Sequence, residues 1–261
     1  MVHSSGSTGK PGYFIYDPFA WDFMITGMLR AALWGMSMGE IFRFLVKGPR
    51  ILYVAATDGR YGGAMAVGDG IDGVGAKQLF LDVKTPLPEW IEKIQAFKPN
   101  MVVGYPSAIK ILGELEQKGS IHLQVQRIVS CGEPLGASLR QYLEQTFHAV
   151  VLNYYGASES LALGVEMSGE AGMSLFDDMN VIEAEEDAIY LTCLYNFAQP
   201  LIRYRISDRL MVLPEQDGGA GPFTRVKSIE AGVRIFCGLK TALACGNFCI
   251  RWRWRGSAWR G

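Results

Sequence analysis

Apolar and polar positions follow two patterns along this chain. Between residues 50 and 153, short apolar runs alternate with longer amphipathic stretches. This alternation predicts strands separated by helices, which is typical of a mostly parallel sheet. We expect strands at 50–56, 77–83, 101–105, 126–131 and 149–153, and helices at 85–97 (with Thr85 as N-cap), 106–118 and 135–147.

The pattern differs at both ends of this region. Residues 13–17 resemble a short strand, and the Asp17-Pro18 pair predicts a helix start, with Asp17 as N-cap and Pro18 at the first turn. That helix should run to about Met36, with a second helix at 39–46. After Leu161 only strands are expected, at 181–184, 188–194 and 201–204. The predicted fold class is therefore α/β, with a smaller β-rich segment that is antiparallel or barrel-like.

Composition divides the chain further. It has 261 residues, of which 49% are hydrophobic, enough to bury a core. The formal net charge is only −1, yet residues 225–261 carry eight Lys or Arg and one Glu. We expect three units, 1–160, 161–230 and 231–261, the last being an Arg-, Trp- and Cys-rich tail.

The sequence carries few targeting or redox signals. No signal peptide is recognisable at the N-terminus, and the longest apolar stretch, 23–36, is too short to cross a bilayer. The five cysteines are an odd number and lack zinc spacing. We expect a cytoplasmic protein without a membrane or nucleic-acid partner.

A loop rich in Ser, Thr and Gly opens the chain. Glycine lets backbone N–H groups turn towards an anion, hydroxyls add donors, and a lysine adds a point charge. The loop departs from the Walker A pattern, and a flexible leader is the alternative interpretation. Its candidate phosphate-binding residues are Ser4, Ser5, Gly6, Ser7, Thr8, Gly9 and Lys10.

Three further loops follow predicted parallel strands, at 104–107, 131–134 and 155–159. The carboxyl ends of parallel strands share one edge of the sheet, where ligands of such sheets bind. We therefore expect these loops to lie together at a ligand site.

Four motifs stand in order along the chain, at 4–11, 132–135 (Gly-Glu-Pro-Leu), 153–159 (Asn-Tyr-Tyr-Gly-Ala-Ser-Glu) and 200–208 (Pro-Leu-Ile-Arg-Tyr-Arg-Ile-Ser-Asp). Together they resemble the AMP-forming, adenylate-forming enzymes. The Gly-Tyr-Pro-Ser run at 104–107 and the run at 200–208 are similar to the phenylacetate–coenzyme A ligase branch in particular. The resemblance covers roughly residues 3–230.

The resemblance implies an activity and its reactants. Such enzymes activate a carboxylic acid with ATP and Mg²⁺, forming an acyl-adenylate and pyrophosphate, and then transfer the acyl group to coenzyme A. The implied substrate is an aryl acid such as phenylacetate, and the implied fold is part of the large domain of such an enzyme.

The resemblance also implies residue roles. Residues 4–10 would hold the phosphates, and Tyr105 would border the acyl pocket. Gly132, Glu133 and Pro134 would line the adenine slot, and Tyr155 would stack on adenine. Gly156 would belong to the same nucleotide-binding loop, and Ser158 would contact phosphate. Glu159 would be the metal ligand, and Asp208 would accept hydrogen bonds from both ribose hydroxyls.

Each role has a structural alternative. Tyr155 fits a half-buried tyrosine at a strand end, and Glu159 a carboxylate that starts a helix. Asp208 fits a turn after a strand, and Tyr105 fits ordinary core packing.

Two features depart from the family pattern. The family carries a substantial segment before the phosphate loop, and a C-terminal domain with a catalytic lysine, for which no residue is assigned here. Residues 231–261 look like a changed reading frame, so we expect a truncated ligase fragment. The open alternatives are a non-catalytic nucleotide-binding or regulatory protein of the same fold, and a binding module that acts through its basic tail.

Overall fold

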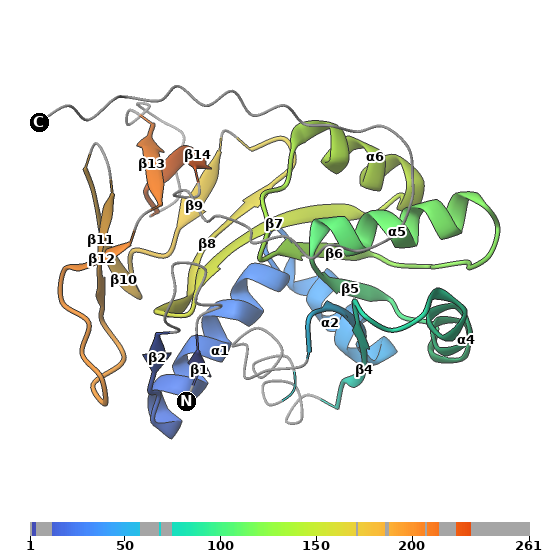
Figure 1. The fold of residues 1–261 in the computed structure, drawn as a ribbon, viewed down its shortest axis with the longest axis horizontal. Helices are drawn as coiled ribbons and strands as arrows, with labels where there is room; N and C mark the ends of the chain where they lie inside the picture. The colour runs from blue at the N-terminus through green and yellow to red at the C-terminus, as the bar shows by residue number, and fades with distance from the viewer. Residues whose placement is uncertain are drawn as a thin grey trace, which may run out of the picture.

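A large mixed sheet organises the molecule (Figure 1). The computed structural model describes residues 2–3, 12–57, 68, 75–170, 172–185, 188–206, 208–213 and 223–230. Within these residues, the large sheet has nine strands in the order β13-β14-β9-β8-β7-β6-β5-β3-β4. The strands from β4 to β7 pair in parallel, and those from β7 to β13 pair antiparallel.

The parallel half confirms the predicted alternation of strands and helices. Its strands are β3 (Arg50–Ala55), β4 (Lys77–Asp82), β5 (Met101–Gly104), β6 (Arg127–Cys131) and β7 (Val150–Ala157). The helices between these strands are α4 (Leu87–Phe97), α5 (Pro106–Gln117) and α6 (Ala137–Phe147).

Helices cover both faces of this half, with α5 and α6 on one face and α1 and α2 on the other (Figure 1). Side chains alternate between the two faces of a strand. In β3, Leu52 and Val54 pack in the same cluster as residues of α4, α5 and α6. Tyr53, from the opposite face of β3, packs with Phe44 of α2. Burial on both faces explains why β3 is apolar almost throughout.

Two of the N-terminal elements, the strand at Tyr13 and the helix at Pro18, begin at the predicted residues, although that helix ends at Ala32 rather than near Met36. Strand β1 (Val2–His3) pairs antiparallel with β2 (Tyr13–Phe14). Helix α1 (Pro18–Ala32) is capped by Asp17, whose carboxylate accepts a hydrogen bond from the Ala20 amide at 2.7 Å. Helix α2 (Met38–Lys47) begins with a capping box between Ser37 and Glu40.

One predicted cap is wrong. Helix α4 begins at Leu87 with Pro86 as N-cap, and no side chain caps it. Thr85 instead donates its amide hydrogen to the carbonyl of Asp82 at 2.9 Å, so it belongs to the turn after β4. The prolines that follow Thr85 set the helix start, because a proline fits the first turn of a helix.

The segment after β7 is all strand, as predicted, but it enters two sheets. Strands β8 (Ser160–Met167), β9 (Met173–Leu175), β13 (Arg209–Val212) and β14 (Arg225–Glu230) extend the large sheet. A separate antiparallel sheet is formed by β10 (Asn180–Ala184), β11 (Ile189–Cys193) and β12 (Tyr204–Ile206). This small sheet is the predicted β-rich appendage.

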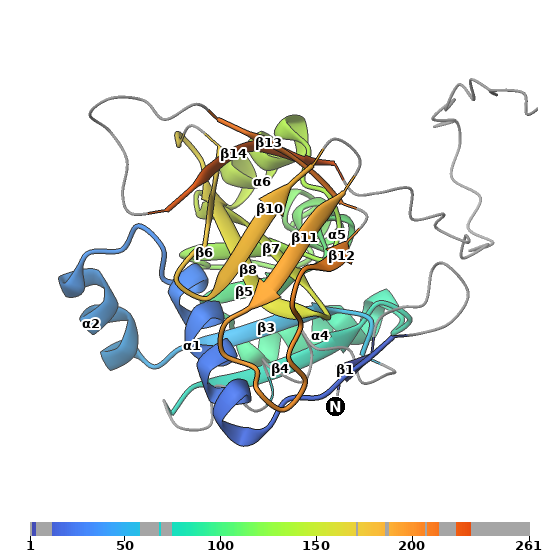
Figure 2. The same ribbon diagram turned by 90° about the vertical axis from the view of Figure 1, so that its left-hand side faces the viewer.

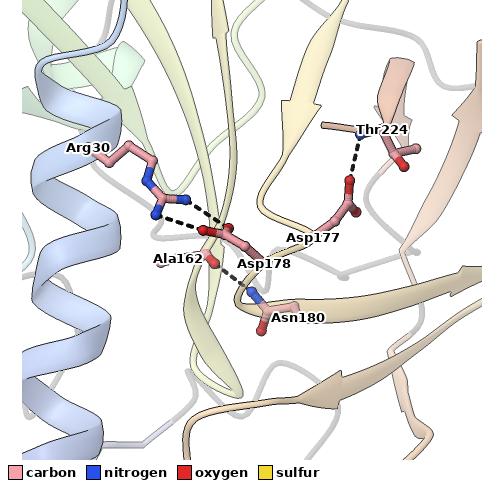
Figure 3. Close-up of polar contacts among 6 residues, drawn as sticks. All are labelled: Arg30, Ala162, Asp177, Asp178, Asn180 and Thr224. Carbon is pink, nitrogen blue, oxygen red and sulfur yellow. Dashed lines mark hydrogen bonds and ion pairs between the residues drawn. The ribbon is translucent and has the colours of Figure 1, made fainter. Parts of the chain in front are cut away.

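Polar contacts connect the small sheet to the rest of the fold (Figure 3). Arg30 of α1 donates two hydrogen bonds to Asp178, both at 2.8 Å, and its guanidinium lies 5.2 Å from the ring centre of Phe176. Asn180, which is fully buried, donates to the carbonyl of Ala162 at 2.8 Å. The turn before β10 is therefore fixed to both α1 and β8.

Two of the sequence predictions concern residues 4–10 and 231–261, which lie outside the described residues. None of the helices in the described part of the chain combines the length and the apolar character needed to cross a bilayer.

Candidate functional site

The carboxyl edge of the parallel half gathers the loops that the sequence singled out. Strands β5, β6 and β7 are adjacent and parallel, with Gly104 opposite Ser130, and Cys131 opposite Tyr154. The segments that follow these strands therefore leave the sheet at the same edge. The predicted convergence of the loops at 104–107, 131–134 and 155–159 is confirmed for these residues.

Two of the loops touch directly. Glu133 reaches across from the loop after β6, and its carboxylate accepts a hydrogen bond from the Ser107 amide at 3.2 Å. Ser107 lies in the first turn of α5, which has no side-chain cap of its own. Glu133 therefore caps α5 from a different loop, and its negative charge suits the helix N-terminus.

Backbone shape at this edge depends on two glycines. A Cβ on Gly104 would lie 2.0 Å from the carbonyl oxygen of Val54, so only glycine allows β5 to approach β3 this closely. Gly132 has φ of +77°, and a Cβ there would lie 2.7 Å from the Tyr105 ring. Tyr105 thus packs over the glycine that precedes Glu133. The structure therefore supports a packing role for Tyr105, and its acyl-pocket role stays a prediction.

The Cys131 thiol lies beside these loops. Burial and the charge of Glu133 raise its pKa to about 12, although a backbone hydrogen bond from Gly104 acts in the opposite direction. A thiol with this pKa is protonated at neutral pH, and the thiolate is the nucleophilic form. Cys131 is therefore poorly suited to act as a nucleophile.

The third loop differs from its predicted form. Strand β7 continues to Ala157 rather than ending near Asn153, and Ser158 and Glu159 form the turn into β8. Gly156 lies within the strand, where a Cβ would be 2.4 Å from the carbonyl oxygen of Leu161. The sequence missed this hairpin because the pairing of β8 with β7 is a contact between strands that the local pattern does not specify. Glu159 therefore does not start a helix, which excludes that alternative.

Tyr16 holds this turn, although the sequence did not identify it. Its hydroxyl hydrogen-bonds to the carbonyl oxygens of Ser158 and Glu159, both at 3.0 Å. Burial raises the pKa of Tyr16, and Tyr195, Cys193 and Glu159 add to the effect. The phenol therefore stays protonated and remains a donor to the turn. No signal in the sequence connects Tyr16 to a turn more than 140 positions away.

A hydrogen bond between Tyr155 and Asp208 joins strand β7 to the segment that follows β12. Tyr155, in β7, donates its hydroxyl hydrogen to Oδ2 of Asp208 at 2.8 Å. Asp208 is only 3% exposed, whereas Tyr155 is half-buried. A buried carboxylate needs such a partner to offset its loss of hydration. Residues that are 53 positions apart thus place an aromatic ring and a carboxylate side by side.

Glu159 acts electrostatically on the neighbouring strand β12. Burial raises the pKa of Tyr204, and the charge of Glu159 raises it further. The carboxylate therefore lies near the strand that leads to Asp208. A single carboxylate fits Mg²⁺, which in nucleotide sites binds one or two carboxylates together with phosphate oxygens. Among the described residues, no group of three or more His, Cys, Asp or Glu is arranged to hold a metal ion.

The remaining candidates occupy the rim of the site or lie outside the described residues. Gly132, Pro134 and Gly156 are exposed, and Glu133, Ser158 and Glu159 are half-buried. The structure thus groups the candidates from the three loops and Asp208 at one edge. The candidates of the N-terminal loop, Ser4 to Lys10, lie outside the described residues.

Comparisons with known proteins identify relatives of this chain. It is 25% identical to a phenylacetate–coenzyme A ligase from Aromatoleum evansii over 274 residues, covering 94% of the chain and 59% of that protein. It is 30% identical to an indoleacetate–lysine synthetase from Pseudomonas savastanoi over 132 residues, covering 49% of the chain and 33% of that protein. The chain therefore spans less than two thirds of either relative. No protein-family model matches it.

Solved structures share the fold. A 2-hydroxyisobutyryl-CoA ligase, determined in complex with 2-HIB-AMP and CoA, superposes with a TM-score of 0.70 at 19% identity. The match covers 89% of this chain and 52% of that one. The predicted α/β fold, with a sheet flanked by helices and a smaller β-rich segment, is confirmed.

Proposed function

From its homology to phenylacetate–coenzyme A ligases and its adenylate-forming fold, we propose that the chain takes part in ATP-dependent activation of a carboxylic acid. In this reaction a carboxylate oxygen attacks the α-phosphorus of ATP, pyrophosphate leaves, and an acyl-adenylate forms. A thioester forms when the thiol of coenzyme A displaces AMP. We also propose that the chain acts in the cytoplasm, where ATP and coenzyme A are available.

The contact between Tyr155 and Asp208 is the observation that carries the proposal. A purine prefers an aromatic face, and a ribose diol donates two hydrogen bonds that one carboxylate can accept. The structure holds the Tyr155 hydroxyl 2.8 Å from the Asp208 carboxylate. In our proposal the Tyr155 ring stacks on adenine, and the Asp208 carboxylate binds the ribose.

The other roles follow the same arrangement. Gly132, Glu133 and Pro134 would line adenine through their backbone, with Glu133 already committed by its side chain to α5. Ser158 and Glu159, held by Tyr16, would face the phosphates, and Glu159 would hold Mg²⁺. The ion would neutralise phosphate charge. Donors aimed in advance at developing charge reduce the reorganisation that the reaction needs.

The relatives favour one acid class. The name of one relative contains phenylacetate and that of the other indoleacetate, and both are arylacetic acids. We propose an arylacetic acid as the substrate of this chain and coenzyme A as the acceptor.

The test is ATP–pyrophosphate exchange with the full chain, using phenylacetate, indoleacetate, benzoate and a short alkyl acid. Exchange that depends on an arylacetic acid and is lost in Lys10→Ala supports the proposal. Lys118→Ala is the control, because this exposed lysine lies at the far end of the helix that starts at the site. AMP binding without exchange supports a non-catalytic nucleotide-binding protein instead, and absence of both contradicts any nucleotide function.

A further inference from the structure

The segment that enters β12, the strand leading to Asp208, is irregular at Arg203. The Cys193 amide of β11 donates to the carbonyl of Leu201 at 3.0 Å, and two residues earlier in β11 Leu191 is paired with Tyr204. Between these two points β11 has one residue, Thr192, whereas the returning segment has Ile202 and Arg203. An extra residue on one strand of an antiparallel pair is a β-bulge.

The bulge places Arg203 in an unusual backbone conformation. Its φ is +49°, in the left-handed region that glycine and asparagine adopt most readily. Such a conformation persists only where neighbouring contacts enforce it.

Contacts from both other strands of the small sheet surround Arg203. The Arg203 amide donates to the Thr192 hydroxyl at 3.0 Å, and the guanidinium lies 5.0 Å from the ring centre of Tyr190. The guanidinium also forms ion pairs with Glu183 and, at 3.5 Å, with Glu185. Both the backbone amide and the side chain of Arg203 therefore contact the neighbouring strands, and the variants below separate their contributions.

The extra residue determines which side chains of β12 face the core. With the bulge, Ile206 is opposite Ile189 and is 5% exposed, in a cluster that includes Tyr155. Without it, β12 would slip by one residue and Arg205 would take the position of Ile206. Such a slip moves every side chain of the strand to the other face. Asp208, two residues beyond Ile206, would no longer meet the hydroxyl of Tyr155.

We propose that Arg203 is a positioning residue, whose left-handed backbone sets the register of β12 and so places Asp208 beside Tyr155. The inference rests on the proposed nucleotide function only for its consequence, the alignment of Asp208 with the ribose. Its structural part, the link between residue 203 and the contact of Asp208 with Tyr155, stands independently.

Substitutions at position 203 separate the backbone conformation from the side chain. Valine is strained at positive φ because it is β-branched, whereas glycine and asparagine accept that conformation. Arg203→Val should weaken AMP binding by at least about tenfold, and Arg203→Asn and Arg203→Gly should stay within about threefold of the wild type. Arg225→Val is the control, because it removes an arginine at the start of β14, where φ is not positive.

The same variants should also be crystallised, because this measurement does not depend on nucleotide binding. In Arg203→Asn and Arg203→Gly the contact between the Tyr155 hydroxyl and Asp208 should persist, and in Arg203→Val it should be lost. If Arg203→Val does not fold, Arg203→Thr, which is also β-branched but is polar and suits an exposed position, serves as the second strained variant.

The outcomes distinguish the two proposals. Retention of the Tyr155–Asp208 contact and of AMP affinity in Arg203→Val would overturn the positioning role. Equal loss in the valine, asparagine and glycine variants would assign the effect to the arginine side chain and likewise overturn it. If the wild type binds no AMP but the contact is lost in Arg203→Val, the nucleotide function fails while the positioning role of Arg203 stands.

Discussion

The two halves of the large sheet contribute to the candidate site in different ways. The parallel half contributes turns, in which glycine backbones and a capping side chain, Glu133, hold neighbouring loops together. The antiparallel strands contribute Asp208, a buried carboxylate that lies between β12 of the small sheet and β13 of the large sheet and that a partner in β7 satisfies. Figure 2 shows β10, β11 and β12 in front of the large sheet.

This difference follows from topology. All carboxyl ends of parallel strands lie at one edge, so their loops meet whatever the details of side-chain packing. Antiparallel strands end alternately at opposite edges, so a residue such as Asp208 reaches the site only through a specific register. The parallel half should therefore be destabilised by side-chain atoms added where backbones lie close together. The antiparallel contribution should be lost when strand register changes or when a single polar group is removed.

The largest effect is expected from Gly104→Ala. The new Cβ would lie 2.0 Å from the Val54 carbonyl oxygen, which forces β5 away from β3. We expect a loss of about 3 kcal/mol in the free energy of unfolding, measured by urea denaturation. Gly39→Ala is the control, because a Cβ there meets nothing within 4 Å. Equal stability of the two variants would show that close backbone approach does not limit the parallel half.

Asp208→Ala tests the antiparallel contribution. Removing a carboxylate that accepts two ribose hydrogen bonds should weaken AMP binding by at least about 100-fold, because hydrogen bonds to charged groups contribute about 1.5–3 kcal/mol each. Calorimetric titration with AMP measures the change. Asp178→Ala, which removes a partly exposed carboxylate bound to Arg30, should leave AMP affinity unchanged. Wild-type affinity in Asp208→Ala would remove Asp208 from the site.

Gly132→Ala separates backbone strain from steric overlap. Gly132 and Gly119 both have positive φ, +77° and +69°, but only at Gly132 would a Cβ meet another group, the Tyr105 ring. We expect Gly132→Ala to lose about 2 kcal/mol of unfolding free energy and Gly119→Ala about 1 kcal/mol. Thermal and urea unfolding of both variants provide the comparison. Identical losses would mean that Tyr105 does not constrain the loop.

A smaller effect is expected from Glu133→Ala. The variant removes the side-chain acceptor for the Ser107 amide, and loss of a helix cap costs about 1 kcal/mol. Urea denaturation measures it, with Glu114→Ala on the exposed face of α5 as the control. A change no larger than in the control would show that water replaces Glu133 at the helix N-terminus.

The smallest expected effect is a change in the pKa of the Cys131 thiol in the same variant, Glu133→Ala. The charge of Glu133 raises the pKa of the thiol, so its removal should lower that pKa, while burial, the larger cause, still holds it above the ordinary value. The thiolate would then form at a lower pH than in the wild type. Site-resolved alkylation followed by mass spectrometry across a pH series should show this shift of Cys131. An onset at the same pH would exclude an interaction between the two groups.

Much of the parallel half could be predicted from the sequence. Apolar runs between amphipathic stretches locate β3 to β6 and their helices, because burial on both faces makes each strand continuously apolar. The Asp17 N-cap of α1 could also be predicted, because its signal, the Asp17-Pro18 pair, lies at the helix start itself. The N-cap of α4 and the end of β7 were predicted wrongly, since proline placement in one case and a hairpin partner in the other decided them.

The sequence by itself determined which chemical groups are present and the order in which strands and loops follow one another, because local patterning and parallel topology specify both. Only the tertiary structure decided that Tyr16 holds the turn at Ser158 and Glu159, that Glu133 caps α5, and that Tyr155 meets Asp208. These contacts join segments far apart in the chain and depend on strand register. Register is set by the packing of whole strands, so no local sequence signal reveals it.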